Sequence, residues 1–190
     1  MSTPQIVGAA ILAGVVLVLL MAVISYNRFV RQRILVAESW RQIDVELVRR
    51  HDLVPSLVAV VQAYAAHERA LFDHVAAARA RAAAPSASVA QQGADEARLT
   101  VGLRHLMAVS EGYPTLRADR QFRALQDGLV DTEDRIAAAR RFYNGNVRAL
   151  NTRVESIPSS LVAALGGFQR AEYFLADESE ARTVVALDLR

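Results

Sequence analysis

Four charged side chains stand within apolar stripes of the helices that the sequence predicts, namely Asp44, Glu68, Glu133 and Arg140. Glu133 and Arg140 are seven residues apart, so they share one helix face two turns from each other. An isolated buried charge costs several kcal/mol, so these groups must reach water or pair across helices. Carboxylates paired with arginine would form a polar network between helices. With a base, a nucleophile or a metal ligand beside them they would form a hydrolytic site.

The motifs of known catalytic and metal sites are absent from the sequence. None of the four histidines has Glu or Asp three residues before it, which excludes the Glu-x-x-His carboxylate-bridged metal sites of helical bundles. His67-Glu68 begins like a zinc-protease helix, but Leu71 stands where the second histidine belongs. Gly166-Gly167 lacks the lysine of a phosphate loop, and zero cysteine excludes thiolate sites. We therefore expect no cofactor, no metal and no enzymatic activity.

Three interpretations of the charged positions remain open. The side chains reach solvent from flanking positions, or they form a cross-helix network that fixes the register of the helices, or they line an active site. The active site is the least favoured of the three, because no catalytic group accompanies the carboxylates.

The amino-terminal part of the chain predicts a membrane anchor. Residues 6–24 form an uncharged apolar run of 19 residues, about 28 Å long as a helix and close to the ~30 Å hydrocarbon core. No basic residue precedes the run and no small-x-small site follows it, which favours an uncleaved anchor over a signal peptide. Arg28, Arg31 and Arg33 follow the run and could contact lipid headgroups. We expect a single-pass inner-membrane protein with its amino terminus outside and residues 26–190 in the cytoplasm.

Apolar residues spaced by three and four predict an all-α fold, an amino-terminal transmembrane helix followed by an antiparallel four-helix bundle. The expected helices cover residues 27–51, 53–82, 94–111 and 117–156, with a loop at residues 83–93. Asp52 could cap a new helix, which favours a break there over one long helix kinked at Pro55. Three parts of the chain are expected: an amino-terminal segment with the transmembrane helix (residues 1–25), a cytoplasmic helical bundle (residues 26–168) and a carboxy-terminal tail (residues 169–190).

Two carboxy-terminal segments differ from the helices before them. Residues 157–168 carry no charge, and they form either a strand or short helix capping the bundle core or an interfacial element touching lipid or another membrane protein. The tail from residue 169 keeps apolar patches at residues 173–175 and 184–187 and is expected to be extended or frayed.

The overall charge balance gives no reason to expect nucleic acid as a partner. The pI is about 9.4, yet 22 basic and 20 acidic residues leave a formal charge of only +2. A basic face of the kind that binds nucleic acid does not follow from so small an excess.

Five segments of the chain resemble the LemA family of bacterial membrane proteins. They are Val-Glu-Leu-Val-Arg-Arg-His-Asp-Leu-Val-Pro-Ser-Leu-Val at residues 45–58, Tyr-Ala-Ala-His-Glu at 64–68, Glu-Gly-Tyr-Pro-Thr-Leu at 111–116, Thr-Glu-Asp-Arg-Ile-Ala-Ala-Ala-Arg-Arg-Phe-Tyr-Asn at 132–144 and Ile-Pro-Ser-Ser-Leu at 157–161. The likeness covers residues 26–174. Ser56 and Gly112 stand where the family pattern suggests Asn, and Ile157 where it suggests Phe.

The resemblance implies a single span with its amino terminus outside and a cytoplasmic antiparallel bundle. It also implies that a set of polar residues belongs to the family pattern, which favours the cross-helix network; the set is Asp44, Arg50, Glu68, Glu133, Arg140 and Asn144. It brings no settled activity. We therefore expect a non-enzymatic membrane-anchored scaffold that meets lipid and another envelope protein or a second copy of itself. The alternative is a ligand sensor or hydrolase using an interhelical Asp/Glu/Arg site.

Overall fold

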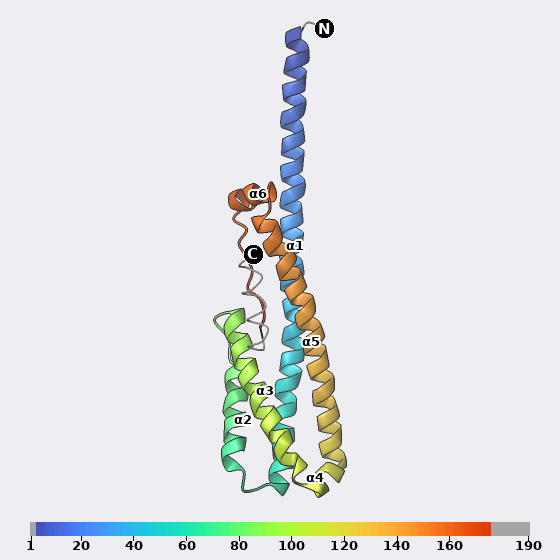
Figure 1. Ribbon diagram of the computed structural model, residues 1–190, viewed down its shortest axis with the longest axis vertical. Coiled ribbons are helices and arrows are strands. Elements are labelled where there is room, and N and C mark those ends of the chain that lie inside the picture. The colour runs from blue at the N-terminus through green and yellow to red at the C-terminus, as the bar shows by residue number, and fades with distance from the viewer. Residues whose placement is uncertain (1–2, 176–190) are drawn as a thin grey trace. The chain divides into compact units, whose positions relative to one another are not determined.

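The computed structural model describes residues 3–175, and this part of the chain contains helices and no strand (Figure 1). The elements are α1 (Thr3–Tyr64), α2 (Arg69–Ala82), α3 (Val89–Glu111), α4 (Pro114–Ala118), α5 (Arg120–Glu155) and α6 (Ser159–Gly166). The predicted all-α fold is confirmed. Packing divides the described chain into two compact units, which we call the anchor unit (residues 3–39 and 145–171) and the bundle unit (residues 40–144 and 172–175). This division does not test the boundaries expected at residues 25 and 168.

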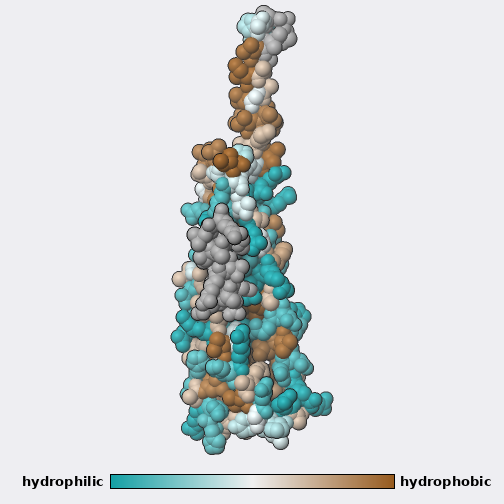
Figure 2. Space-filling view, in the orientation of Figure 1, coloured by the Kyte–Doolittle hydropathy of each residue, from teal (hydrophilic) through white to brown (hydrophobic). Residues whose placement is uncertain are grey.

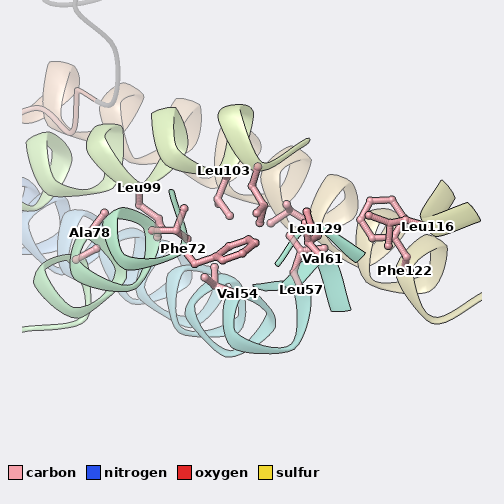
Figure 3. Packing of buried hydrophobic residues seen from close by; sticks show 14 residues of the cluster. Val54, Leu57, Val61, Phe72, Ala78, Leu99, Leu103, Leu116, Phe122 and Leu129 are labelled. Carbon is pink, nitrogen blue, oxygen red and sulfur yellow. The ribbon is translucent and has the colours of Figure 1, made fainter. Parts of the chain in front are cut away.

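The bundle unit is the predicted antiparallel four-helix bundle. Residues 40–64 of α1, then α2, α3 and residues 120–144 of α5 follow one another through short connections, and α2 and α3 run side by side in Figure 1. Apolar side chains of all four helices interlock in its interior (Figure 3). The buried cluster comprises Val54, Leu57, Val61, Ala65, Phe72, Val75, Ala78, Ala82, Leu99, Leu103, Leu106, Leu116, Phe122 and Leu129.

The break expected near Asp52 is wrong, because α1 continues through Pro55 to Tyr64. Proline has no N–H, so the carbonyl of His51, four residues earlier, loses its helical partner. Here Nε of Arg79 donates a hydrogen bond to that carbonyl at 2.6 Å. A tertiary contact from α2 thus satisfies the group that the proline leaves open, and the predicted transmembrane and first bundle helices are one helix.

The chain turns instead at residues 65–68. The N–H of Ala65 still bonds to Val61 O at 2.9 Å, and the N–H of Glu68 bonds to Ala65 O at 3.0 Å. The expected helix over residues 53–82 is therefore divided between α1 and α2. Glu68 lies in the turn and is exposed, so its predicted place in the apolar stripe of a helix is wrong.

The next helices start earlier or later than expected because local capping groups set their ends. α3 begins at Val89 rather than residue 94, since the side chain of Ser88 accepts a hydrogen bond from the N–H of Gln91 at 3.1 Å. Pro114 opens the short helix α4, which the sequence did not predict. The carboxylate of Asp119 then accepts from the N–H of Gln121 at 2.7 Å, at the start of α5.

The anchor unit combines residues 3–39 of α1 with the last turns of α5, the helix α6 and the segment after it. Phe29, Leu150, Ala163 and Phe168 form its buried core. In Figure 1 the amino-terminal turns of α1 extend past α6 without a neighbouring helix. One window of α1 is long and apolar enough to cross a membrane, and none of it is buried. Residues 157–168 thus contain a short helix that supplies core residues to this unit.

Candidate functional site

Arg50 of α1 joins three helices of the bundle unit. Its side chain is 3% exposed, its Nη2 donates to Oε2 of Glu96 on α3, and its Nη1 donates to Oε1 of Glu133 on α5 at 2.8 Å. Nη1 also reaches the hydroxyl of Thr100 at 3.3 Å. One guanidinium therefore faces two carboxylates from two different neighbours, which fixes α1, α3 and α5 in one register.

Arg50, Glu96 and Glu133 form an ion cluster, and Glu96 is its most deeply buried charge, with 1% of its side chain exposed. Its Oε1 lies 2.9 Å from Nε2 of His51 and accepts from Nε2 of Gln92 at 2.9 Å. Burial opposes the negative charge, but the hydrogen bond from His51 and the charge of Arg50 outweigh it and hold the pKa of Glu96 below its ordinary value. Glu96 is a carboxylate at neutral pH, and both of its oxygens have partners.

Arg50 keeps its charge for the same reason. Burial alone would lower the pKa of the guanidinium, but the charges of Glu96 and Glu133 raise it overall. Glu133 is 39% exposed on its side chain, so water reaches the outer edge of the ion cluster while Glu96 stays inside. A carboxylate already committed to two donors is a poor base, so this arrangement is suited to holding helices together.

A cavity of about 280 Å³ lies beside the ion cluster. It is lined by Arg50, Glu96 and Glu133, and also by Arg140 of α5, which makes further interactions. Among the residues predicted as a polar network, the structure thus brings Arg50 and Glu133 into direct contact and places Arg140 at the same cavity.

The other predicted network residues lie elsewhere. Asp44 lines a second cavity of about 450 Å³, together with Trp40 and the loop before α3. Glu68 is exposed in the turn after α1. Asn144 faces the carboxy-terminal segment of the described chain.

Residues 169–175 form an extended strap that α5 holds by its polar side chains. In the bundle unit, Asn144 Nδ2 donates to Phe174 O at 3.1 Å and Asn144 Oδ1 accepts from Phe174 N–H at 3.0 Å. The hydroxyl of Tyr143 donates to Glu172 O at 2.8 Å. Burial, and to a smaller extent the negative charge of Glu172, raise the pKa of Tyr143 to about 12. In the anchor unit, Asn151 pairs in the same two-bond manner with Ala171. The expected extended tail is thus pinned over these residues, whereas residues 184–187 lie outside the described chain.

The three basic residues after the apolar run, Arg28, Arg31 and Arg33, are exposed on α1 in the anchor unit. The guanidinium of Arg33 lies 5.7 Å from the centroid of the Phe168 ring. All three therefore present charge at the end of the apolar stretch of α1.

Glu96 and His51 are the site residues that sequence reasoning missed. Glu96 stands three residues before Leu99, so it occupies the apolar stripe of α3, the same pattern that singled out Glu133. Within residues 3–175, no group of three or more His, Asp or Glu side chains is arranged to hold a metal ion.

Comparison with known proteins places these features in a family. Residues 39–188 match the model of the LemA family. The chain is 29% identical to Magnetosome protein MamQ of Magnetospirillum gryphiswaldense and 30% identical to Magnetosome protein MamQ 2 of Paramagnetospirillum magneticum. Each match covers 78% of this chain and 64% of the relative, so the chain spans less than two thirds of the length of these relatives.

Proposed function

The chain belongs to the LemA family, and from this premise we propose that it is a membrane-anchored helical scaffold that binds another envelope protein or a second copy of itself. One observation carries the proposal. Arg50 and Glu96, the most deeply buried charges of the bundle unit, pair with each other and with groups on neighbouring helices. Charges that are already paired hold helices rigidly, which suits a binding surface better than catalysis. The curated relatives are named for the magnetosome, a name that states no reaction.

The proposed orientation puts the amino terminus outside and the bundle unit in the cytoplasm, with the anchor in the inner membrane. Arg28, Arg31 and Arg33 follow the apolar window of α1 directly, and basic residues are retained on the cytoplasmic side of a span. A reporter enzyme that is active only outside the cytoplasm, fused after Arg190, should be silent. Activity of that fusion would overturn the orientation.

Site-specific photo-crosslinking in intact membranes tests the scaffold role. Exposed apolar side chains of the bundle unit, such as Val45, Val101 and Val130, offer positions where a photo-reactive residue does not disturb the core. We expect a discrete adduct of one mass from some positions and none from others, because a binding surface covers one face only. If every position gives only the uncrosslinked monomer, the scaffold proposal fails.

The cavity beside the ion cluster favours one alternative, a ligand sensor or hydrolase that uses Arg140, Glu133 and Arg50. Its test is the thermal unfolding of the full chain in the presence of inorganic phosphate as an anionic probe, with Arg140→Met as the matched variant. A rise in Tm in the original chain that Arg140→Met abolishes would favour this alternative over the scaffold.

A further inference from the structure

Helix α6 carries an exposed apolar face. Leu161 and Leu165 are four residues apart and therefore lie on the same side of the helix, and Leu165 is 91% exposed. Ile157, in the turn before α6, is 87% exposed, while Ala163 faces the core of the anchor unit. Residues 156–169 contain no charged side chain. Figure 2 shows the resulting hydrophobic surface on α6 and on the amino-terminal part of α1.

Aromatic contacts hold α6 at the end of the apolar run of α1. The Phe168 ring, just after α6, stacks on Phe29 with centroids 4.8 Å apart and meets Tyr26 edge-on at 5.3 Å. Gly166 makes the approach possible, because a Cβ there would lie 2.6 Å from the Phe168 ring. Since the run ends at Ile24, α6 is fixed at the level where a membrane-spanning α1 would leave the hydrocarbon.

An apolar groove of about 830 Å³ connects α6 with the run itself. Val18, Met21 and Ala22 line it from α1, and Leu161 and Leu165 line it from α6. From residue 18 to residue 24 the helix rises about 9 Å, so the groove reaches that far along the part of α1 that would lie in acyl chains. This extent along α1 falls within the roughly 5–10 Å to which interfacial helices are buried in a bilayer.

Arginines border the groove at its polar end. Arg28 of α1 and Arg153 of α5 both line it. The Nε of Arg153 is buried and has no hydrogen-bond acceptor among the described residues. A phosphate group next to the groove would meet the positive charges of both arginines.

The turn between α5 and α6 satisfies its own polar groups. The Ser159 hydroxyl donates to Arg153 O at 2.7 Å, and the Ser156 hydroxyl donates to Thr152 O at 2.6 Å. At the other end of α6, Gly167 adopts φ +67°, which lets the N–H of Phe168 bond to Ala163 O at 3.0 Å. Internal pairing of this kind is what a segment in contact with hydrocarbon requires.

We propose that α6 is a second membrane contact of this chain, lying in the interface of the bilayer that α1 crosses. Its exposed face and the groove are occupied by phospholipid acyl chains, and Arg28 and Arg153 bind the phosphate of the lipid that fills the groove. The proposal rests on the continuity of the groove with the apolar run and on the charge at its polar end. It concerns the anchor unit alone, so its failure would leave the scaffold proposal standing.

Spin labelling of the full chain in vesicles tests the proposal. The sequence contains no cysteine, so Leu165→Cys gives a single nitroxide site, and the exposure of Leu165 means that the change removes little packing. Val130→Cys, at a position 56% exposed on α5 in the bundle unit, is the matched control. In vesicles of phosphatidylcholine and phosphatidylglycerol, we expect the ratio of oxygen to nickel-chelate collision rates to be about tenfold higher at residue 165 than at residue 130.

Two outcomes would overturn the proposal. Equal collision ratios at residues 165 and 130 would place α6 in water. Spin–spin broadening at residue 165 that disappears when labelled chain is diluted with unlabelled chain would mean that a second copy covers α6. A label introduced by Ile157→Cys supports the proposal if it repeats the result of residue 165, and it contradicts the proposal if the chelate reaches it freely.

Discussion

Replacing Arg50 by methionine should be among the most destabilising single changes in the bundle unit. The substitution keeps much of the side-chain length but leaves the carboxylate of Glu96, with 1% of its side chain exposed, without its guanidinium partner. Removing one partner of a buried ion pair costs about 3–5 kcal/mol of unfolding free energy. Glu133 adds little to this cost, because it is 39% exposed and water can replace the lost contact.

The matched control lies on the same helix as Glu96. Arg98 pairs with Asp95 at 2.5 Å, but its side chain is 54% exposed. Exposed pairs contribute only about 0.2–1 kcal/mol, so Arg98→Met should have a small effect. The double variant Arg50→Met/Glu96→Leu removes both buried charges and should unfold less readily than Arg50→Met alone.

Urea unfolding of the full chain in detergent micelles measures these differences. Trp40, the one tryptophan, packs against Tyr143 and Phe174 with ring centroids 5.4 Å apart in each case, so its fluorescence reports the bundle unit. Equal losses in Arg50→Met and Arg98→Met would refute the reasoning. The reasoning would also be refuted if the double variant lost as much as Arg50→Met and the single variant Glu96→Leu together, because that would mean no coupling between Arg50 and Glu96.

Three further predictions concern pH and the strap. Because the pKa of Glu96 is lowered from 4.5, its contribution to the unfolding free energy is fully present above pH 4.5 and is lost as the pH falls through the folded-state pKa. In urea titrations at a series of acidic pH values, Glu96→Gln should therefore make the unfolding free energy depend less on pH. Asn144→Leu leaves the peptide groups of Phe174 unpaired, so it should lower the unfolding free energy by about 2 kcal/mol and speed proteolysis within residues 169–175. Unchanged cleavage would mean that the strap does not depend on this pairing. Gly93→Ala should also loosen the strap, since its Cβ would lie too close to the carbonyl oxygen of Leu175, and limited proteolysis that finds it as resistant as the original chain would count against this packing.

Apolar spacing predicted the helical architecture, and the carboxy-terminal ends of α2, α3 and α5 were predicted to within one residue, but the end of α1 and the starts of the later helices were not. Pro55 and Asp52 have the local features of a helix boundary, yet α1 continues, and Arg79 of α2 donates to the His51 carbonyl that the proline leaves without a helical partner. The turn at residues 65–68 contains neither Gly nor Pro, so nothing local announces it.

The candidate site was only partly predictable for a related reason. The pattern of a charge in an apolar stripe found Glu133, and the family resemblance added Arg50, but Glu96, the second carboxylate that binds Arg50, was missed. The serine cap that starts α3 was present in the sequence as Ser88 followed by Gln91. Asn144 was found through the resemblance, yet its acceptor and donor are main-chain atoms of residue 174, which no side-chain pattern predicts.

The asparagines that hold the strap contact peptide groups rather than side chains. Asn144 would make the same two hydrogen bonds to residue 174 whatever side chain stood there, and Asn151 would do the same for residue 171. Sequence drift at positions 171 and 174 is therefore limited by packing, with one exception. Proline at either position has no N–H to donate to the asparagine oxygen, so proline is the residue that evolution should exclude from positions 171 and 174.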